Sequence, residues 1–388
     1  MSNIPPLLDM IRDLIGTPSI SSVDPTLDQG NRAVIELLAS WLNDTGFHVE
    51  IMPLPGTTSK ANLIATLGSG SGGLVLSGHT DTVPYDEGKW TYDPFSLTEA
   101  NQRLYGLGTS DMKSFLALAL EASRVLRAGD LKEPLILLAT ADEETSMAGA
   151  RALVDHARPR ARHAVIGEPT GLRPVRMHKG ILMESIHLQG RSGHSSDPSL
   201  GNSALEAMYT AIGAILSWRD DLQKNFRDPF FAVPVPTLNL GHIHGGDSPN
   251  RICPECELHI DLRPLPGMDL QELRGELHNR VLKSLQDTGI EVQFEALFAG
   301  VPAMETAADA PIVKLAEKLT GHAAEAVAFG TEAPYLSQLG MDTVVMGPGD
   351  IDQAHQPDEY LALDRLTPTI DILKQMVNTV CIMGKPLI

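Results

Sequence analysis

The sequence predicts an α/β protein with a mostly parallel sheet, interrupted by an inserted ferredoxin-like α+β domain. Three observations lead to this prediction. Strands and helices alternate from the start of the chain to about Lys179, the order becomes β-α-β-β-α-β over 181–298, and the alternation returns after Gly300. Alternation is typical of a parallel sheet, and the inserted order is that of the ferredoxin-like fold. We therefore expect a discontinuous domain over 1–180 and 299–388 and an inserted domain over 181–298.

The first elements belong to the larger domain. An amphipathic helix is expected over 1–16, because charged residues such as Asp9 and Arg12 interrupt its apolar pattern, which excludes a signal peptide. A second helix, over 31–43, ends close to Gly46, which suits a C-cap. The next expected elements are strands 48–54, 62–67 and 74–77, helix 112–128, strand 134–140, helix 147–156 and strand 164–166. The largely apolar strand 134–140 is typical of a sheet covered on both faces.

The remaining elements form the insertion and then complete the larger domain. In the insertion we expect strand 181–188, helix 204–218, strands 237–243 and 257–263, helix 270–286 and strand 291–298. After it we expect helix 310–319, strand 343–346 and a last helix over 367–383. The two junctions of the insertion lie near Lys179 and Gly300.

Length and charge limit the possible functions. A chain of 388 residues exceeds the usual size of one hydrophobic core, which favours two domains. The formal net charge of −19 would repel nucleic-acid phosphates and anionic lipids, so we expect neither as a partner. No apolar run reaches the length of a membrane span. These features favour a cytoplasmic protein.

The three cysteines do not indicate a structural zinc site. Their odd number argues against a disulfide framework. Cys253 and Cys256 have a spacing seen in zinc sites, but no second cysteine pair completes a tetrahedral ligand set. We interpret them as ordinary thiols in a reducing compartment.

Imidazoles and carboxylates follow the ends of separate predicted strands. His79 follows strand 74–77, the pair Glu143 and Glu144 follows 134–140, Glu168 follows 164–166, and His355 lies in the loop after 343–346. In open α/β sheets the carboxyl ends of the strands form the ligand site. Each residue alone has an ordinary explanation, as a solvated turn or a hydrogen-bonded histidine. Their combination predicts a dinuclear metal site.

Two local spacings support this chemistry. A ligating imidazole is oriented when its second nitrogen donates to a carboxylate, and Asp81 lies two residues after His79. In the pair Glu143 and Glu144, one carboxylate can bind metal while the other accepts a proton from the attacking water. Asp111 would also serve simply as the N-cap of the helix that follows it.

Five segments in order resemble the motifs of the M20 metallopeptidase and deacylase family. They are 78–84 (GHTDTVP), 105–113 (YGLGTSDMK), 139–144 (ATADEE), 166–169 (IGEP) and 354–355 (AH). The segment 190–196 (GRSGHSS) resembles part of the family's lid or dimerisation domain. The resemblance covers essentially the whole chain, so it implies the family's fold, a homodimer and a hydrolase with two zinc ions, which cobalt or manganese could replace.

The resemblance also implies a role for each residue. Asp111 would bridge the two metals, and Glu143 would be the general base. Asp81 would orient the metal ligand His79 without binding metal itself. His79 and Glu168 would complete one metal site, and Glu144 and His355 the other. His194 would reach across the dimer interface toward the substrate carbonyl of the neighbouring subunit. The candidates for binding the substrate carboxylate are Lys179, Asn250, Arg263 and Thr331.

Further segments narrow the resemblance to family members that deacetylate N-acetyl-L-ornithine in arginine biosynthesis. They are 142–151, 240–246, 250–252, 260–267 and 353–360. Four alternatives remain open: a succinyl-diaminopimelate desuccinylase, an aminoacylase, a peptidase of the same family, and a binding protein that has lost activity. The motifs near the scissile amide are common to the enzymes among these. Hinge motion near the two junctions is a further expectation.

Overall fold

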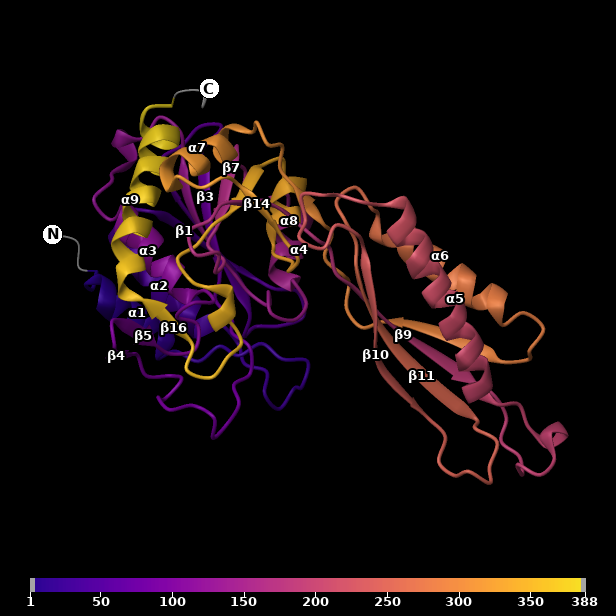
Figure 1. Cartoon of the computed structure of the whole chain (residues 1–388). Coiled ribbons are helices and arrows are strands. Elements are labelled where there is room, and N and C mark those ends of the chain that lie inside the picture. Colours follow the sequence, from indigo (N-terminus) through magenta and orange to yellow (C-terminus); the bar gives the residue numbers. More distant parts are fainter. Residues whose placement is uncertain (1–3, 385–388) are drawn as a thin grey trace. The chain divides into compact units, whose positions relative to one another are not determined.

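The computed structural model describes residues 4–384 and divides the chain into two compact units (Figure 1). Unit 1 comprises the residues up to Arg176, Thr306–Glu325 and the residues from Thr331 on. Unit 2 comprises Met177–Glu305 and Ala326–Gly330. The short segment 326–330 therefore belongs to unit 2, although the sequence predicts it for the larger domain. The mixed α/β fold class, with a separate antiparallel sheet, is confirmed.

The main sheet has nine strands and is parallel at its centre. Its order is β1-β2-β6-β3-β7-β15-β8-β13, and β14 pairs with β8. The strands are β1 His48–Pro53, β2 Ala61–Leu67, β3 Leu74–His79, β6 Leu135–Thr140, β7 His163–Ile166, β8 Val175–His178, β13 Met304–Glu305, β14 Glu325–Val327 and β15 Asp342–Val345. β6, β3, β7 and β15 pair in parallel, and antiparallel strands flank them. Every residue of β3, β6 and β7 is buried, as expected for the centre of such a sheet.

The helices of unit 1 bury one face or more against each other and the sheet. They are α1 Leu7–Ile15, α2 Arg32–Asp44, α3 Lys113–Ser123, α4 Ala148–Asp155, α7 Pro311–Thr320, α8 Ala333–Gln338 and α9 Leu366–Val377. The central helix is α3, which packs against α1, α9, β3 and β6. All of its residues except Glu121 are buried. This burial fixes the residues that precede α3, including Asp111.

Several predicted element ends are wrong. Helix α3 ends at Ser123 instead of Ala128, and the Ser123 hydroxyl donates to the carbonyl oxygens of Ala119 and Leu120 in its last turn. The last predicted helix divides into α9 and a π-helical turn over Asn378–Ile382. A small sheet was not predicted at all: it joins β4 Thr98–Ala100, β5 Arg103–Tyr105 and β16 Tyr360–Ala362 in the order β16-β5-β4.

Unit 2 has the predicted β-α-β-β-α-β order. Its elements are β9 Leu182–Gln189, α5 Ala204–Asn225, β10 Thr237–Gly245, β11 Glu255–Arg263, α6 Leu270–Ser284 and β12 Glu291–Ala296. The strands form an antiparallel sheet in the order β10-β11-β9-β12. Helices α5 and α6 pack on this sheet (Figure 1). The shared core contains Ile186, Leu258 and Trp218. Helix α5 continues to Asn225, seven residues past the predicted end at Trp218.

Two other sequence predictions concern cysteines and membranes. Cys253, Cys256 and Cys381 are buried and free, and Cys256 belongs to the core of unit 2. Neither Cys253 nor Cys256 belongs to a possible metal-binding group among residues 4–384. In the same part of the chain, no helix has both the length and the apolar character needed to cross a membrane.

Candidate metal centre

The main sheet delivers imidazoles and carboxylates to the carboxyl ends of its parallel strands. His79 is the last residue of β3, Glu143 and Glu144 follow β6, and Glu168 follows β7. His355 lies in the loop after β15, just beyond a short 3-10 turn over 351–353. This is the edge at which parallel α/β sheets bind ligands.

Asp111 lies between the two histidines. Its Oδ1 is 3.0 Å from His79 Nε2, and its Oδ2 is 3.5 Å from His355 Nε2. Each histidine also faces a second carboxylate: Glu168 Oε2 is 3.9 Å from His79 Nε2, and Glu144 Oε2 is 3.1 Å from His355 Nε2. The ligand atoms of His79, Asp111 and Glu144 lie within 4.8 Å of one another. The five residues thus form two His/Glu pairs, one on each oxygen of Asp111.

The second nitrogen of His79 is oriented by the main chain. Its Nδ1 lies 2.9 Å from the carbonyl oxygen of Asp81, whereas the Asp81 carboxylate is 3.8 Å away at Oδ1. The expected orienting group was the carboxylate. That carboxylate instead accepts a hydrogen bond at Oδ2 from the backbone N–H of Glu144, over 3.1 Å. Asp81 therefore contacts His79 through its carbonyl oxygen and Glu144 through its carboxylate. These two contacts hold His79 and Glu144 in place.

The site concentrates negative charge in a buried place. Asp111, Glu168 and His79 are at most 8% exposed. Burial, with the neighbouring Glu168, raises the pKa of Glu143 well above its ordinary value, and burial does the same for Glu168. Burial also raises the pKa of Glu144, and the proximity of Asp111 adds to it. So many close carboxylates need cations to remain ionised together.

The imidazoles respond to the same charges. Burial opposes a charge on His79, but the hydrogen bond and charge of Asp111 and the charge of Glu168 raise its pKa well above the usual value. A hydrogen bond with Glu144 raises the pKa of His355 to about 9. Protons on His79 and His355 therefore balance part of the negative charge of the carboxylates. Bound metal ions would neutralise the same charge.

An unpaired oxygen supports the fit of a metal. Oε1 of Glu168 is buried and has no hydrogen-bond partner among the described residues. A buried carboxylate oxygen without a partner is costly, so such an atom calls for a ligand. Two imidazoles with carboxylates are a donor set that zinc, cobalt and manganese accept. The residues present therefore fit a pair of divalent cations.

Glu359 is a supporting residue that the sequence does not reveal. Its Oε1 accepts hydrogen bonds from the backbone N–H groups of Ser110 and Asp111, and its Oε2 accepts one from Gly108. Burial raises its pKa to about 8. Glu359 therefore fixes the loop that presents Asp111. The residue lies four positions after His355, but nothing in its local sequence marks it as buried.

Lys113 and Glu332 are two other buried ionisable residues near the centre to which the sequence assigns no role. The Lys113 ammonium donates to the carbonyl oxygen of Thr17 over 2.7 Å, and burial lowers its pKa to about 7. Glu332 accepts a hydrogen bond from the hydroxyl of Thr140 over 2.7 Å, and burial raises its pKa to about 7. Thr140 is the last residue of β6, so Glu332 supports the strand end that precedes Glu143 and Glu144.

The candidate substrate-binding residues are distributed over both units. In unit 1, Thr331 is buried and its hydroxyl accepts from the backbone N–H of Ala333. In unit 2, Lys179 donates to the carbonyl oxygen of Val235 over 2.6 Å, and its pKa is lowered by burial and by the charge of Arg263. Lys179 and Arg263 therefore share one neighbourhood. A role of Thr331, Lys179 and Arg263 in substrate binding stays a prediction.

Two further candidates lie in the loops of unit 2. His194 is exposed, and its Nδ1 lies 3.2 Å from the backbone N–H of Ser196 and 2.7 Å from the Ser196 hydroxyl. Because the Ser196 N–H donates to Nδ1 of His194, the Nε2 atom of His194 carries the proton and is the nitrogen that can donate to a ligand. Asn250 lies in a loop where its side-chain oxygen accepts a hydrogen bond from the hydroxyl of Ser248.

Comparison with known proteins agrees with this architecture. A model of the family described as peptidase family M20/M25/M40 matches residues 75–379. Among solved structures, an M20 family metallo-carboxypeptidase from Sulfolobus solfataricus is 19% identical, with a TM-score of 0.76 over 96% of this chain and 99% of that one. The aminopeptidase PepT of Bacillus cereus is 20% identical, with a TM-score of 0.74 over 96% and 98%. A dinuclear metal-binding peptidase of Bacillus subtilis is 17% identical, with a TM-score of 0.68 over 96% and 97%. At these identities the structural likeness shows a shared fold.

Proposed function

Because the chain belongs to peptidase family M20/M25/M40, we propose that it is a metal-dependent amide hydrolase that deacetylates N-acetyl-L-ornithine. The products would be L-ornithine and acetate, a step of arginine biosynthesis in the cytoplasm. The observation that carries the proposal is the position of Asp111, whose two oxygens face two different histidines, each with its own glutamate. Such a ligand set fits two cations that share one carboxylate.

The metal ligands of the proposed enzyme are His79, Asp111, Glu144, Glu168 and His355. Zinc is the expected metal, and cobalt suits the same donors. Divalent cations held there would polarise the scissile carbonyl and lower the pKa of the attacking water. The protein supplies a rigid, buried frame in which Asp81 and Glu359 hold two of the ligand-bearing loops.

Glu143 is the proposed general base. It follows β6 directly beside the ligand Glu144, and burial with neighbouring Glu168 raises its pKa. A carboxylate with a raised pKa is a better proton acceptor near neutral pH than an ordinary one. Glu143 takes a proton from the water that attacks the acetyl carbonyl, and it returns this proton to the leaving nitrogen of ornithine. Proton transfer of this kind typically contributes about 10²–10⁴-fold to a rate.

The choice of acetylornithine rests on sequence segments away from the metals. Those segments are 142–151, 240–246, 250–252, 260–267 and 353–360. The substrate carboxylate needs cationic donors, and the neighbouring Lys179 and Arg263 are suitable, with Asn250 and Thr331 as further polar contacts. His194, with its proton on Nε2, is proposed to donate to the substrate carbonyl of the partner subunit in a homodimer.

The alternative substrates share the chemistry at the amide. A desuccinylase, an aminoacylase and a peptidase would use the same ligands and the same base, so the metal centre does not separate them. A binding protein without activity is the remaining alternative. It would not need a second glutamate beside a complete ligand set, and Glu143 has that place here.

The decisive experiment is a side-by-side turnover assay. The protein is treated with a chelator, divided, and reloaded with zinc or cobalt alone. Each sample is then given N-acetyl-L-ornithine, N-succinyl-diaminopimelate, N-acetylmethionine and a dipeptide. We expect the highest kcat/KM for acetylornithine, and no turnover without metal. Faster turnover of another substrate would reject the proposed specificity, and equal turnover of the chelated protein would reject the metal mechanism.

A further inference from the structure

One face of the unit 2 sheet carries four histidines. Alternate residues of a strand point to opposite faces. In β11, Cys256, Leu258 and Ile260 pack into the core with α5 and α6, so Glu257 and His259 point to the other face. The histidines on that open face are His187 of β9, His242 and His244 of β10, and His259 of β11. We call these four residues and Glu257 the histidine patch.

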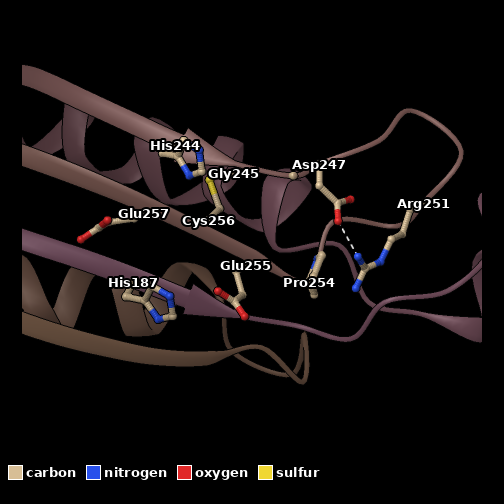
Figure 2. A pocket seen from close by; sticks show the side chains of 10 residues that line it. His187, His244, Gly245, Asp247, Arg251, Pro254, Glu255, Cys256 and Glu257 are labelled. Atoms are coloured by element: carbon tan, nitrogen blue, oxygen red, sulfur yellow. Dashed lines mark hydrogen bonds and ion pairs between the residues drawn. The ribbon is translucent and has the colours of Figure 1, made fainter.

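Strand register arranges the histidine patch in two adjacent rows. In the first row, Glu257 of β11 pairs with His244 of β10 on one side and with His187 of β9 on the other. These three residues are among those that line a pocket of about 310 Å³. Figure 2 shows their side chains. In the second row, His259 of β11 pairs with His242 and with Ser185. Two neighbouring strands therefore hold His242, Glu257 and His259 close together.

The distances within the histidine patch suit a metal ion. One ligand atom from each of His242, Glu257 and His259 lies within 4.8 Å of the other two. The ring centres of His242 and His259 are 4.7 Å apart, and His259 Nε2 is 2.9 Å from Glu257 Oε1. The hydroxyl of Ser185 donates to the same oxygen of Glu257 over 2.8 Å. Such an outer hydrogen bond orients a ligating carboxylate.

Charge and rigidity favour cation binding at this place. The Glu257 carboxylate is held by hydrogen bonds from His259 and Ser185, and it supplies negative charge for a cation. A divalent cation can bind this carboxylate together with the imidazoles of His242 and His259. The ligands lie on paired strands of a sheet, so little rearrangement is needed.

We propose that the histidine patch is a binding site for a divalent transition-metal ion such as zinc, with His242, Glu257 and His259 as ligands. Imidazole with carboxylate is a donor set for this class of ion, and it distinguishes zinc or nickel from magnesium and calcium, which prefer oxygen alone. The side chains of His259 and Glu257 are 32% and 39% exposed, so water completes the coordination. The site shares no residue with the centre around Asp111 and does not rest on the proposed function.

The first test compares bound zinc in matched variants. Wild type, Glu257→Gln and His259→Asn are dialysed to equilibrium against zinc chloride, with His322→Asn as a control that removes one exposed histidine from unit 1. The centre around Asp111 is the same in all four proteins, so its zinc cancels. We expect wild type and the control to bind one more zinc per chain than Glu257→Gln and His259→Asn. Equal zinc content in all four would overturn the proposal.

The second test locates the ion. Diethyl pyrocarbonate modifies accessible imidazoles, and peptide mass spectrometry reports the rate at each histidine. With zinc present, we expect slower modification of His242 and His259 in wild type and no slowing in Glu257→Gln, which keeps the shape of the side chain. His322 serves as the internal reference and should react equally in every sample. Equal rates with and without zinc at His242 and His259 would overturn the proposal.

Discussion

Glu359 accepts a hydrogen bond from the backbone N–H of Asp111, with 3.0 Å between the two heavy atoms. The same carboxylate binds the N–H groups of Ser110 and Gly108, so one buried side chain holds the whole turn before α3. Because Asp111 contacts both His79 and His355, the position of this turn sets where its carboxylate lies between the two histidines.

We predict that Glu359→Gln weakens metal binding. The amide group of glutamine places a donor where the structure has an acceptor, so at least one backbone N–H of the turn loses its partner. Loss of a group that orients a metal ligand typically costs about 10- to 100-fold in affinity. Equilibrium dialysis with zinc measures the effect. Asp352→Asn, an exposed acid in the nearby loop, is the control and should bind zinc as wild type does. Unchanged zinc affinity in Glu359→Gln would contradict the supporting role of Glu359.

Glu143→Gln should retain its metal and lose turnover. The substitution keeps the size of the side chain but removes its ability to accept a proton, so kcat should fall by about 10²–10⁴-fold. Zinc content measured on the same sample separates loss of the base from loss of the metal. Glu87→Gln, a change at an exposed glutamate, is the matched control. Turnover of Glu143→Gln at the wild-type rate would exclude Glu143 as the base.

The elements that could be predicted are those with a strong local pattern. The apolar runs of β3 and β6 mark buried strands, and the β-α-β-β-α-β order of unit 2 follows from its alternating strands. Helix ends were less predictable. The expected helix 112–128 stops at Ser123, and Arg127 and Asp130 form a separate 3-10 turn in which the Asp130 carboxylate accepts from the Arg127 N–H. The pattern of apolar residues continues through this change, so periodicity alone does not reveal it.

Prediction of the candidate metal centre has the same limit, because local sequence patterns reveal only some of its residues. Residues at or just after the ends of strands, such as His79 and Glu168, can be identified because the fold class tells where those strands end. Glu359 and Glu332 cannot, because their burial and their hydrogen bonds arise from contacts with segments more than 190 residues away. The orientation of His79 by the carbonyl oxygen of Asp81 also depends on backbone geometry that the spacing of the two residues does not specify.

His178 should make the fold sensitive to mild acid. The residue is fully buried, and burial lowers its pKa from 6.5 to about 4. In the unfolded chain His178 would keep its ordinary pKa of 6.5. Between pH 4 and pH 6.5 the unfolded state therefore binds more protons than the folded state. Its contribution to stability is therefore present above the unfolded pKa and is lost as the pH falls toward 4. The expected loss between pH 7 and pH 5 is about 2 kcal/mol.

Urea unfolding at the two pH values measures this loss. In His178→Gln the titrating group is gone, so the difference in the free energy of unfolding between pH 7 and pH 5 should shrink by about 2 kcal/mol. The exposed His48, changed to Gln, is the control and should leave the difference as in wild type. If His178→Gln and wild type lose the same stability on acidification, His178 is not the acid-sensitive group.

His194 should act on the active site of the partner subunit. Its Nδ1 is occupied by the Ser196 N–H, so Nε2 carries a proton for the substrate carbonyl. We expect His194→Ala to lower kcat with zinc content unchanged. The decisive measurement mixes inactive His194→Ala with inactive Glu143→Ala after subunit exchange. In a hybrid dimer one site receives an intact Glu143 from its own chain and an intact His194 from the other. Half of the dimers in an equal mixture are hybrids with one working site each, so about a quarter of wild-type activity should return. No recovery in a mixture shown to contain hybrids, or wild-type turnover by His194→Ala alone, would exclude the role across the interface.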